Sequence, residues 1–170
     1  MTITRMALSL VLGLAACGSG AAKQSDQTEG SNQLRDCLSE LLAAAGVDTA
    51  KLQRRTINGP ADESAQGSTI AEFRDSAQRR VLVVTYFGET GRTRYAYYFA
   101  SRTSYLQRTL EERYAGPITT ALPTIVDTAT TEVFVCDGAL KQPVADISVY
   151  NEGREILVEA DSLLRSSRNR

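Results

Sequence analysis

The 170-residue chain contains no histidine, and this absence excludes several kinds of chemistry. Histidine is the usual general base near neutral pH, the partner of serine and cysteine nucleophiles, and the commonest metal ligand. The chain also lacks a surplus of positive charge, since 19 basic and 20 acidic side chains give a formal net charge of −1. A nucleic-acid binder needs such a surplus to face phosphates. We therefore expect no nucleic-acid partner, no metal and no cofactor.

The sequence also lacks the common catalytic motifs. It has no phosphate-binding glycine loop, no Cys-x-x-Cys pair, no nucleophile elbow and no calcium loop. Carboxylates that could form a glycosidase-like acid/base pair remain at Asp127, Glu132, Asp137 and Asp146, although nothing in their spacing requires it. Because acidic side chains are usually exposed, solvated surface acids are the simpler interpretation.

The chain begins with one positive side chain, Arg5, followed by an apolar run from Ala7 to Ala16. This pattern is typical of a secretory signal peptide. About ten residues rise only ~15 Å as a helix, roughly half of the hydrocarbon core, so the run is too short to span a membrane. No later stretch approaches 18 uninterrupted apolar residues. Any membrane attachment must therefore have another origin.

The end of the apolar run supplies that origin. Leu14-Ala15-Ala16-Cys17 resembles the lipobox of bacterial lipoproteins, and the resemblance covers only the first 17 residues. In that family the cysteine receives a diacylglyceryl group, the signal peptide is cut just before it, and the new amino terminus is often acylated too. The resemblance implies that residues 1–16 are removed and that Cys17 carries the lipid. The alternative is a plain secretory signal, which would place Leu14 where a small residue is preferred.

Residues 18–33 contain no large apolar side chain and so cannot contribute to a core. We expect residues 17–33 to form a flexible, lipid-anchored tether with a mean span of roughly 20 to 24 Å. Residues 34–170 then form a single domain, long enough for one hydrophobic core.

Two cysteines remain besides Cys17. Cys37 and Cys136 are 99 residues apart, and in an exported chain an even pair predicts a disulfide. Two buried free thiols are the alternative. Cys37 belongs to a predicted helix that starts near Ser31, and Cys136 ends a predicted strand over 130–136, so the bond would fasten a helix onto a sheet.

The remaining pattern predicts an α+β fold, with a small, mostly antiparallel sheet covered by the N-terminal helix and one or two further helices. A hairpin is expected over 79–100, and Leu106, Leu110 and Tyr114 give a narrow helical stripe over 104–115. The C-terminal stretch fits either a terminal helix or a hairpin over 147–158, and the helix is favoured. The apolar positions of the helical stripe are Ile156, Leu157, Ala160, Leu163 and Leu164. The stretch 47–68 is expected to be a loop, and an earlier strand covers 69–74.

Arginine and tyrosine alternate along the predicted hairpin. Such composition occurs in interface hot spots and in some carbohydrate or anion sites, but it is also what solvent-flanked strands contain. The side chains concerned are Arg79, Arg80, Arg92, Arg94, Tyr86, Tyr95, Tyr97 and Tyr98.

Together these observations predict a lipid-anchored, extracytoplasmic binding or interaction domain of the bacterial cell envelope. The expected partners are the membrane, through the lipid on Cys17, and an envelope protein, a cell-wall component or a small ligand. The alternative is a carboxylate-dependent cell-wall hydrolase.

Overall fold

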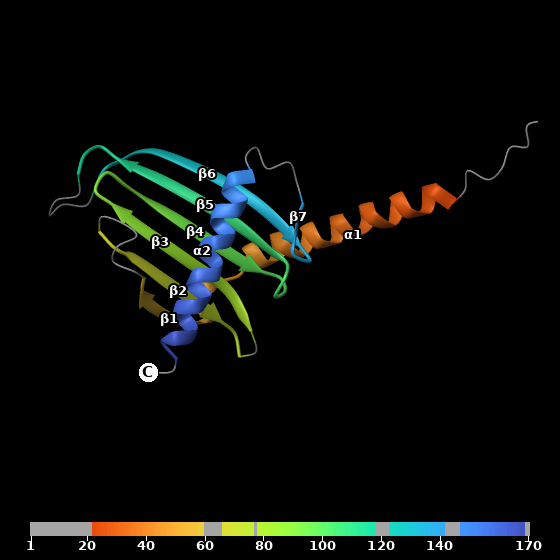
Figure 1. Ribbon diagram of the computed structural model, residues 1–170, viewed down its shortest axis with the longest axis horizontal. Helices are drawn as coiled ribbons and strands as arrows, with labels where there is room; N and C mark the ends of the chain where they lie inside the picture. Colours follow the sequence, from red (N-terminus) through yellow and green to blue (C-terminus); the bar gives the residue numbers. More distant parts are fainter. Residues whose placement is uncertain (1–21, 60–65, 77, 118–122, 142–146, 169–170) are drawn as a thin grey trace, which may run out of the picture.

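The computed structural model describes residues 22–59, 66–76, 78–117, 123–141 and 147–168. It contains two helices, one short 3-10 turn and seven strands (Figure 1). In chain order these are α1 (Ala22–Ala45), η1 (Thr49–Lys51), β1 (Gln53–Asn58), β2 (Ser68–Arg74), β3 (Arg79–Gly88), β4 (Gly91–Phe99), β5 (Tyr105–Tyr114), β6 (Ile125–Cys136), β7 (Ala139–Leu140) and α2 (Ile147–Ser166).

The seven strands form one antiparallel sheet in which each strand pairs with its neighbour in sequence, from β1 to β7. This meander confirms the predicted antiparallel α+β architecture, although the sheet is larger than the small one expected. Asp137 and Gly138 both have positive φ, as a tight turn between β6 and β7 requires.

Helix α2 crosses one face of the sheet (Figure 1), and this face holds the main core. Alternation along β4 directs Tyr95, Tyr97 and Phe99 to it, where they pack with buried residues of β3 and with Ala160 and Leu164 of α2. The Tyr97 hydroxyl donates a hydrogen bond of 2.6 Å to the backbone oxygen of Gly153. The last segment is therefore a helix and not the alternative hairpin. Its apolar stripe completes the core on this face of the sheet.

Helix α1 packs on the opposite face through a smaller cluster. Leu41, Leu106 and Cys136 are buried there, and Cys37 and Cys136 form the predicted disulfide, with a Cα–Cα distance of 6.3 Å. The expected helix-on-sheet link is therefore present. The N-terminal half of α1 projects beyond the sheet (Figure 1).

The extent of α1 differs from the prediction. The helix begins at Ala22, so residues 22–33 of the expected flexible tether are helical. Ala, Lys and Gln favour helix, and Gly30 costs only about 1 kcal/mol. The predicted apolar stripe is also only partly buried. Leu41 is buried, whereas Leu34 and Leu42 are exposed, because the sheet contacts only one narrow side of the helix.

The predicted helix over 104–115 is wrong, because these residues form strand β5. A spacing of four residues fits one face of a helix and equally one face of a strand, since four is a multiple of two. Leu106 and Leu110 therefore share a face in either structure. Gln107 and Thr109, on the other face of the strand, are buried as well, and the Gln107 amide donates a hydrogen bond to the backbone oxygen of Val149 in α2.

Residues 53–58, expected to be loop, form edge strand β1. This strand carries only one large apolar residue, Ile57. The hairpin and the strand over 69–74 are confirmed. Within the described residues, neither helix is both long and apolar enough to cross a bilayer.

Candidate functional site

A hollow of about 520 Å³ opens where the β3–β4 hairpin lies beside β5 and β6. We call it the hairpin hollow. The strand register explains its position. Gly88 is opposite Gly91, Gly91 is opposite Arg113, and Arg113 is opposite Asp127. Two neighbouring glycines leave the sheet without side chains at this point. Gly91 is also required for packing, since a Cβ there would overlap the backbone oxygen of Glu112.

The next row of the sheet forms the floor and one side of the hollow. Thr93 is opposite both Tyr86 and Glu111, and Glu111 is opposite Ala129. Their side chains point to the same face because alternation keeps a cross-strand row on one side. Ala129 contributes only a methyl group, so the hollow is not filled at β6. The hollow therefore combines a phenol ring, a hydroxyl and a carboxylate around small residues.

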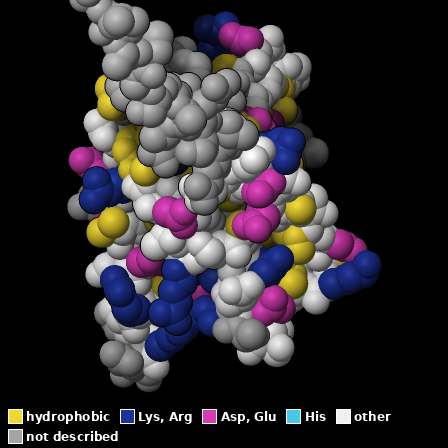
Figure 2. All heavy atoms as spheres, turned by 90° about the vertical axis from the view of Figure 1, so that its right-hand side faces the viewer, with side chains coloured by type: hydrophobic (Ala, Val, Ile, Leu, Met, Phe, Trp, Pro, Cys, Tyr) yellow, Lys and Arg dark blue, Asp and Glu magenta, His cyan; other side chains and the backbone are white. Residues whose placement is uncertain are grey.

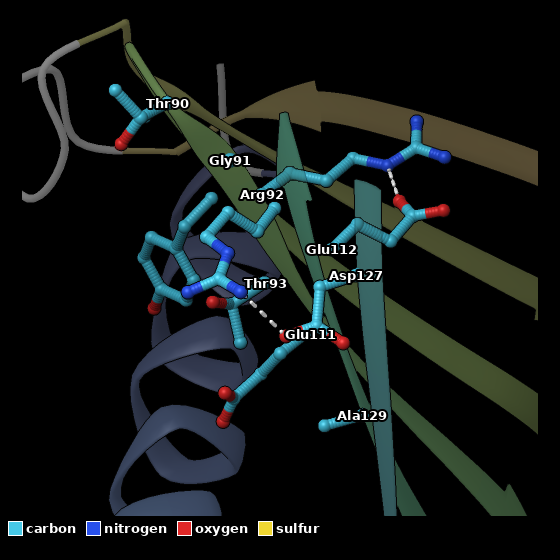
Figure 3. Close-up of a pocket in the computed structure, with 11 residues that line it drawn as sticks. Thr90, Gly91, Arg92, Thr93, Glu111, Glu112, Asp127 and Ala129 are labelled. Atoms are coloured by element: carbon cyan, nitrogen blue, oxygen red, sulfur yellow. Dashed lines mark hydrogen bonds and ion pairs between the residues drawn. The ribbon is translucent and has the colours of Figure 1, made fainter. Parts of the chain in front are cut away.

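The charged side chains of the site separate onto two sides (Figure 3). Arg92 and Glu112 lie opposite each other and form an ion pair on the face away from Glu111. The hydrogen bond from Arg92, outweighing partial burial, holds the pKa of Glu112 below its ordinary value. The same bond with Glu112 raises the pKa of Arg92. This pair therefore stays charged, and its side chains are directed away from the floor of the hollow.

The second ion pair joins Arg113 and Asp127 across β5 and β6 at 2.9 Å. Both side chains are exposed, to 69% and 60%, so the pair contributes at most about 1 kcal/mol to stability. An approaching polar ligand can therefore displace it at little cost. Glu111 is exposed as well and extends on the open side of the hollow (Figure 3).

The structure separates the arginines and tyrosines that the sequence places along the hairpin. Val81 pairs with Tyr98 and Phe87 pairs with Arg92, so Arg79 and Arg80 lie at one end of the sheet and Arg92 and Arg94 at the other, roughly 20 Å apart. Of the four tyrosines only Tyr86 lines the hollow.

Tyr95 and Tyr97 are instead core residues. Their hydroxyls bond Glu152 and Gly153 of α2. Burial, together with the bond to Glu152, raises the pKa of Tyr95, and burial raises that of Tyr97. Both therefore stay neutral and serve to position α2.

The four carboxylates considered from the sequence do not converge. Asp127 lines the hollow, Glu132 pairs with Arg108 on the opposite face, and Asp137 lies in the β6–β7 turn. Asp146 and Cys17 lie outside the described residues. Glu111 and Glu112, which sequence reasoning missed, also line the hollow; they could have been found only with β5 assigned as a strand.

Glu111 and Asp127 are diagonal neighbours on adjacent strands, since Glu111 is opposite Ala129. Such neighbours lie about 7–8 Å apart between Cα atoms. Among the described residues, no group of three or more acidic, cysteine or histidine side chains is placed to hold a metal ion.

No family model matches the chain, and no curated protein or solved structure is similar to it.

Proposed function

We propose that the protein is a lipid-anchored, extracytoplasmic binding domain of the bacterial cell envelope, which receives a polar ligand or partner segment at the hairpin hollow. The observation that carries the proposal is the lipobox-like Leu14-Ala15-Ala16-Cys17, placed directly behind an apolar run. The disulfide between Cys37 and Cys136 is compatible with an oxidising compartment.

The position of the motif relative to α1 supports the proposal. Only four residues separate Cys17 from the first residue of α1, and the helix rises about 22 Å from there to Cys37. The disulfide then joins this helix to β6. A lipid on Cys17 would thus be connected to the sheet through a helical stalk that is covalently fastened at its far end.

Binding is favoured over catalysis by the exposure of the acids in the hollow. A catalytic carboxylic acid normally lies in a pocket that shields it from water. Glu111 and Asp127 are exposed, and Asp127 is paired with Arg113. The alternative, a carboxylate-dependent hydrolase, needs two carboxyl groups held at a fixed separation across a substrate, whereas two exposed acids suit hydrogen bonding to a ligand.

The anchor is tested by intact-mass analysis of the chain extracted from bacterial membranes. We expect residues 1–16 to be absent and Cys17 to carry the mass of a lipid. The Cys17→Ser variant is the matched control and should carry no lipid and leave the membrane fraction. An unmodified Cys17 in the natural product rejects the anchor.

The binding surface is tested by placing a photo-crosslinking amino acid at Thr93 and irradiating intact membranes. Position Glu155, exposed on α2 and outside the hollow, is the control. We expect an adduct from position 93 and none from position 155. Equal labelling at both positions, or none at either, contradicts the assignment of the hollow.

A further inference from the structure

A second hollow, of about 560 Å³, lies at the other end of the sheet, where the β2–β3 and β4–β5 turns meet the C-terminal part of α2. Four of its nine lining residues are arginines: Arg74, Arg79, Arg102 and Arg165. We call it the arginine pocket. Basic side chains gather at the lower end of the face that Figure 2 shows, where these turns and the end of α2 lie in Figure 1.

A buried carboxylate organises the wall of this pocket. The side chain of Glu72 has no exposed surface, and its Oε1 accepts from Arg74 at 3.1 Å and from Arg79 at 2.9 Å. Its Oε2 accepts from Arg168 at 3.1 Å. Burial would raise the pKa of Glu72, but hydrogen bonds and charges from Arg79 and Arg74 outweigh it and lower that pKa. One carboxylate thus holds three guanidinium groups together.

Arg79 is fixed from three directions. It bonds Glu72 and Asp161, and its guanidinium lies 5.7 Å from the centre of the Phe99 ring. Because the side chain is 19% exposed and held before any ligand arrives, little rotamer entropy remains to be lost when it binds one. Preorganisation of this kind is typical of binding sites.

The charges around the pocket do not balance. Glu72 and Asp161 supply two negative charges against the five positive charges of the four lining arginines and Arg168, an excess of three. Arg102 and Arg165 are exposed and have no carboxylate partner among the residues that the structure describes. They extend from two different elements toward the same hollow, so a negatively charged ligand can be contacted from both.

We propose that the arginine pocket binds a phosphate group, carried either by a soluble phosphoester or by a lipid headgroup. Arginines that approach from separate elements match a tetrahedral phosphate, whose oxygens accept hydrogen bonds on several sides, better than a planar carboxylate. Phe99 and Leu157 in the wall offer apolar contact to the organic part of the ligand. The proposal depends on neither the lipid anchor nor the hairpin hollow.

The test uses the chain purified in a neutral detergent and titrated by calorimetry with two probes, inorganic pyrophosphate and dihexanoyl phosphatidylglycerol. The variant Arg102→Gln/Arg165→Gln removes the two unpaired arginines, which are exposed and so leave the core intact. Arg35→Gln/Arg154→Gln removes two exposed arginines elsewhere and is the matched control for net charge.

We expect saturable binding of at least one probe, weakened tenfold or more in the pocket variant and within twofold of the natural chain in the control. Binding of pyrophosphate alone indicates a soluble phosphate compound as the ligand, and tighter binding of the lipid indicates a headgroup. Failure of both probes to bind, or equal weakening in the two variants, overturns the proposal.

Discussion

Reduction of the Cys37–Cys136 disulfide should lower the melting temperature by several degrees. The bond closes 99 residues, a loop that contains all of β1 to β5 and almost all of β6. In the chain-entropy model such a loop is worth up to about 4.7 kcal/mol, and measured disulfides more often contribute about 2–4 kcal/mol. The unfolding entropy of a domain of roughly 140 residues is about 0.3 kcal/mol/K. The expected shift is therefore about 7–15 °C.

The assay is calorimetric melting of the purified chain with and without a phosphine reductant, after thiol titration has shown that both cysteines are free. The Cys37→Ser/Cys136→Ser variant is the control, since its melting temperature should already be lowered and should not respond to the reductant. An unchanged melting temperature in the fully reduced natural chain would refute the reasoning, because the unfolded chain would then gain no freedom from the broken bond.

The other predictions concern single side chains. In a urea titration at neutral pH, Glu72→Gln should lower the free energy of unfolding by about 3–5 kcal/mol, since three arginines lose their buried partner. Asp127→Asn breaks an exposed pair and should lower it by under about 1 kcal/mol in the same titration. Folding lowers the pKa of Glu72 from its ordinary 4.5, so the contribution of Glu72 to stability is complete above that value and is lost as the pH falls through the folded pKa. Urea titrations below pH 4.5 should therefore show a steeper loss of stability in the natural chain than in Glu72→Gln. Parallel curves for the two chains would contradict this. Gly153→Ala should destabilise the fold by about 1–3 kcal/mol, because the new Cβ overlaps the buried amide of Gln107. Gly30→Ala is the control and should be neutral or stabilising, since a Cβ there meets nothing within 4 Å. Melting temperatures that rise in both variants would show that α2 does not pack as described.

Much of the fold could be predicted from local pattern because its signals are strong. The hairpin of β3 and β4 contains an apolar run and a glycine turn, and the cysteine pair specified which helix meets which strand. The segment β5 could not be predicted correctly, since Leu106, Leu110 and Tyr114 satisfy two periodicities at once. Only the partner strands on both sides, β4 and β6, decide between them.

The two hollows were beyond sequence reasoning for a different physical reason. The hairpin hollow depends on register, which brings Glu111 beside residues of three other strands, and a shift of one residue would turn it to the opposite face. The arginine pocket depends on Glu72, a lone acid within a strand whose importance comes from burial between two nearby arginines, Arg74 and Arg79, and Arg168, which is 96 residues away. Neither register nor tertiary burial is encoded in local spacing.

The preference for arginine over lysine, 16 residues against three, has a structural use beyond charge. On the face of the sheet that α1 packs against, the guanidinium groups of Arg54 and Arg108 lie 5.8 and 5.6 Å from the ring centres of Phe73 and Tyr98. A planar guanidinium stacks on a ring while its edge still donates hydrogen bonds, as Arg108 does to Glu132. A lysine ammonium is more strongly hydrated and offers no plane to stack. The arginines thus shield two aromatic rings on this face, Tyr98 beside the α1 cluster and Phe73 away from it. The same property lets Arg79 contact Phe99, Glu72 and Asp161 at once in the pocket proposed to bind phosphate.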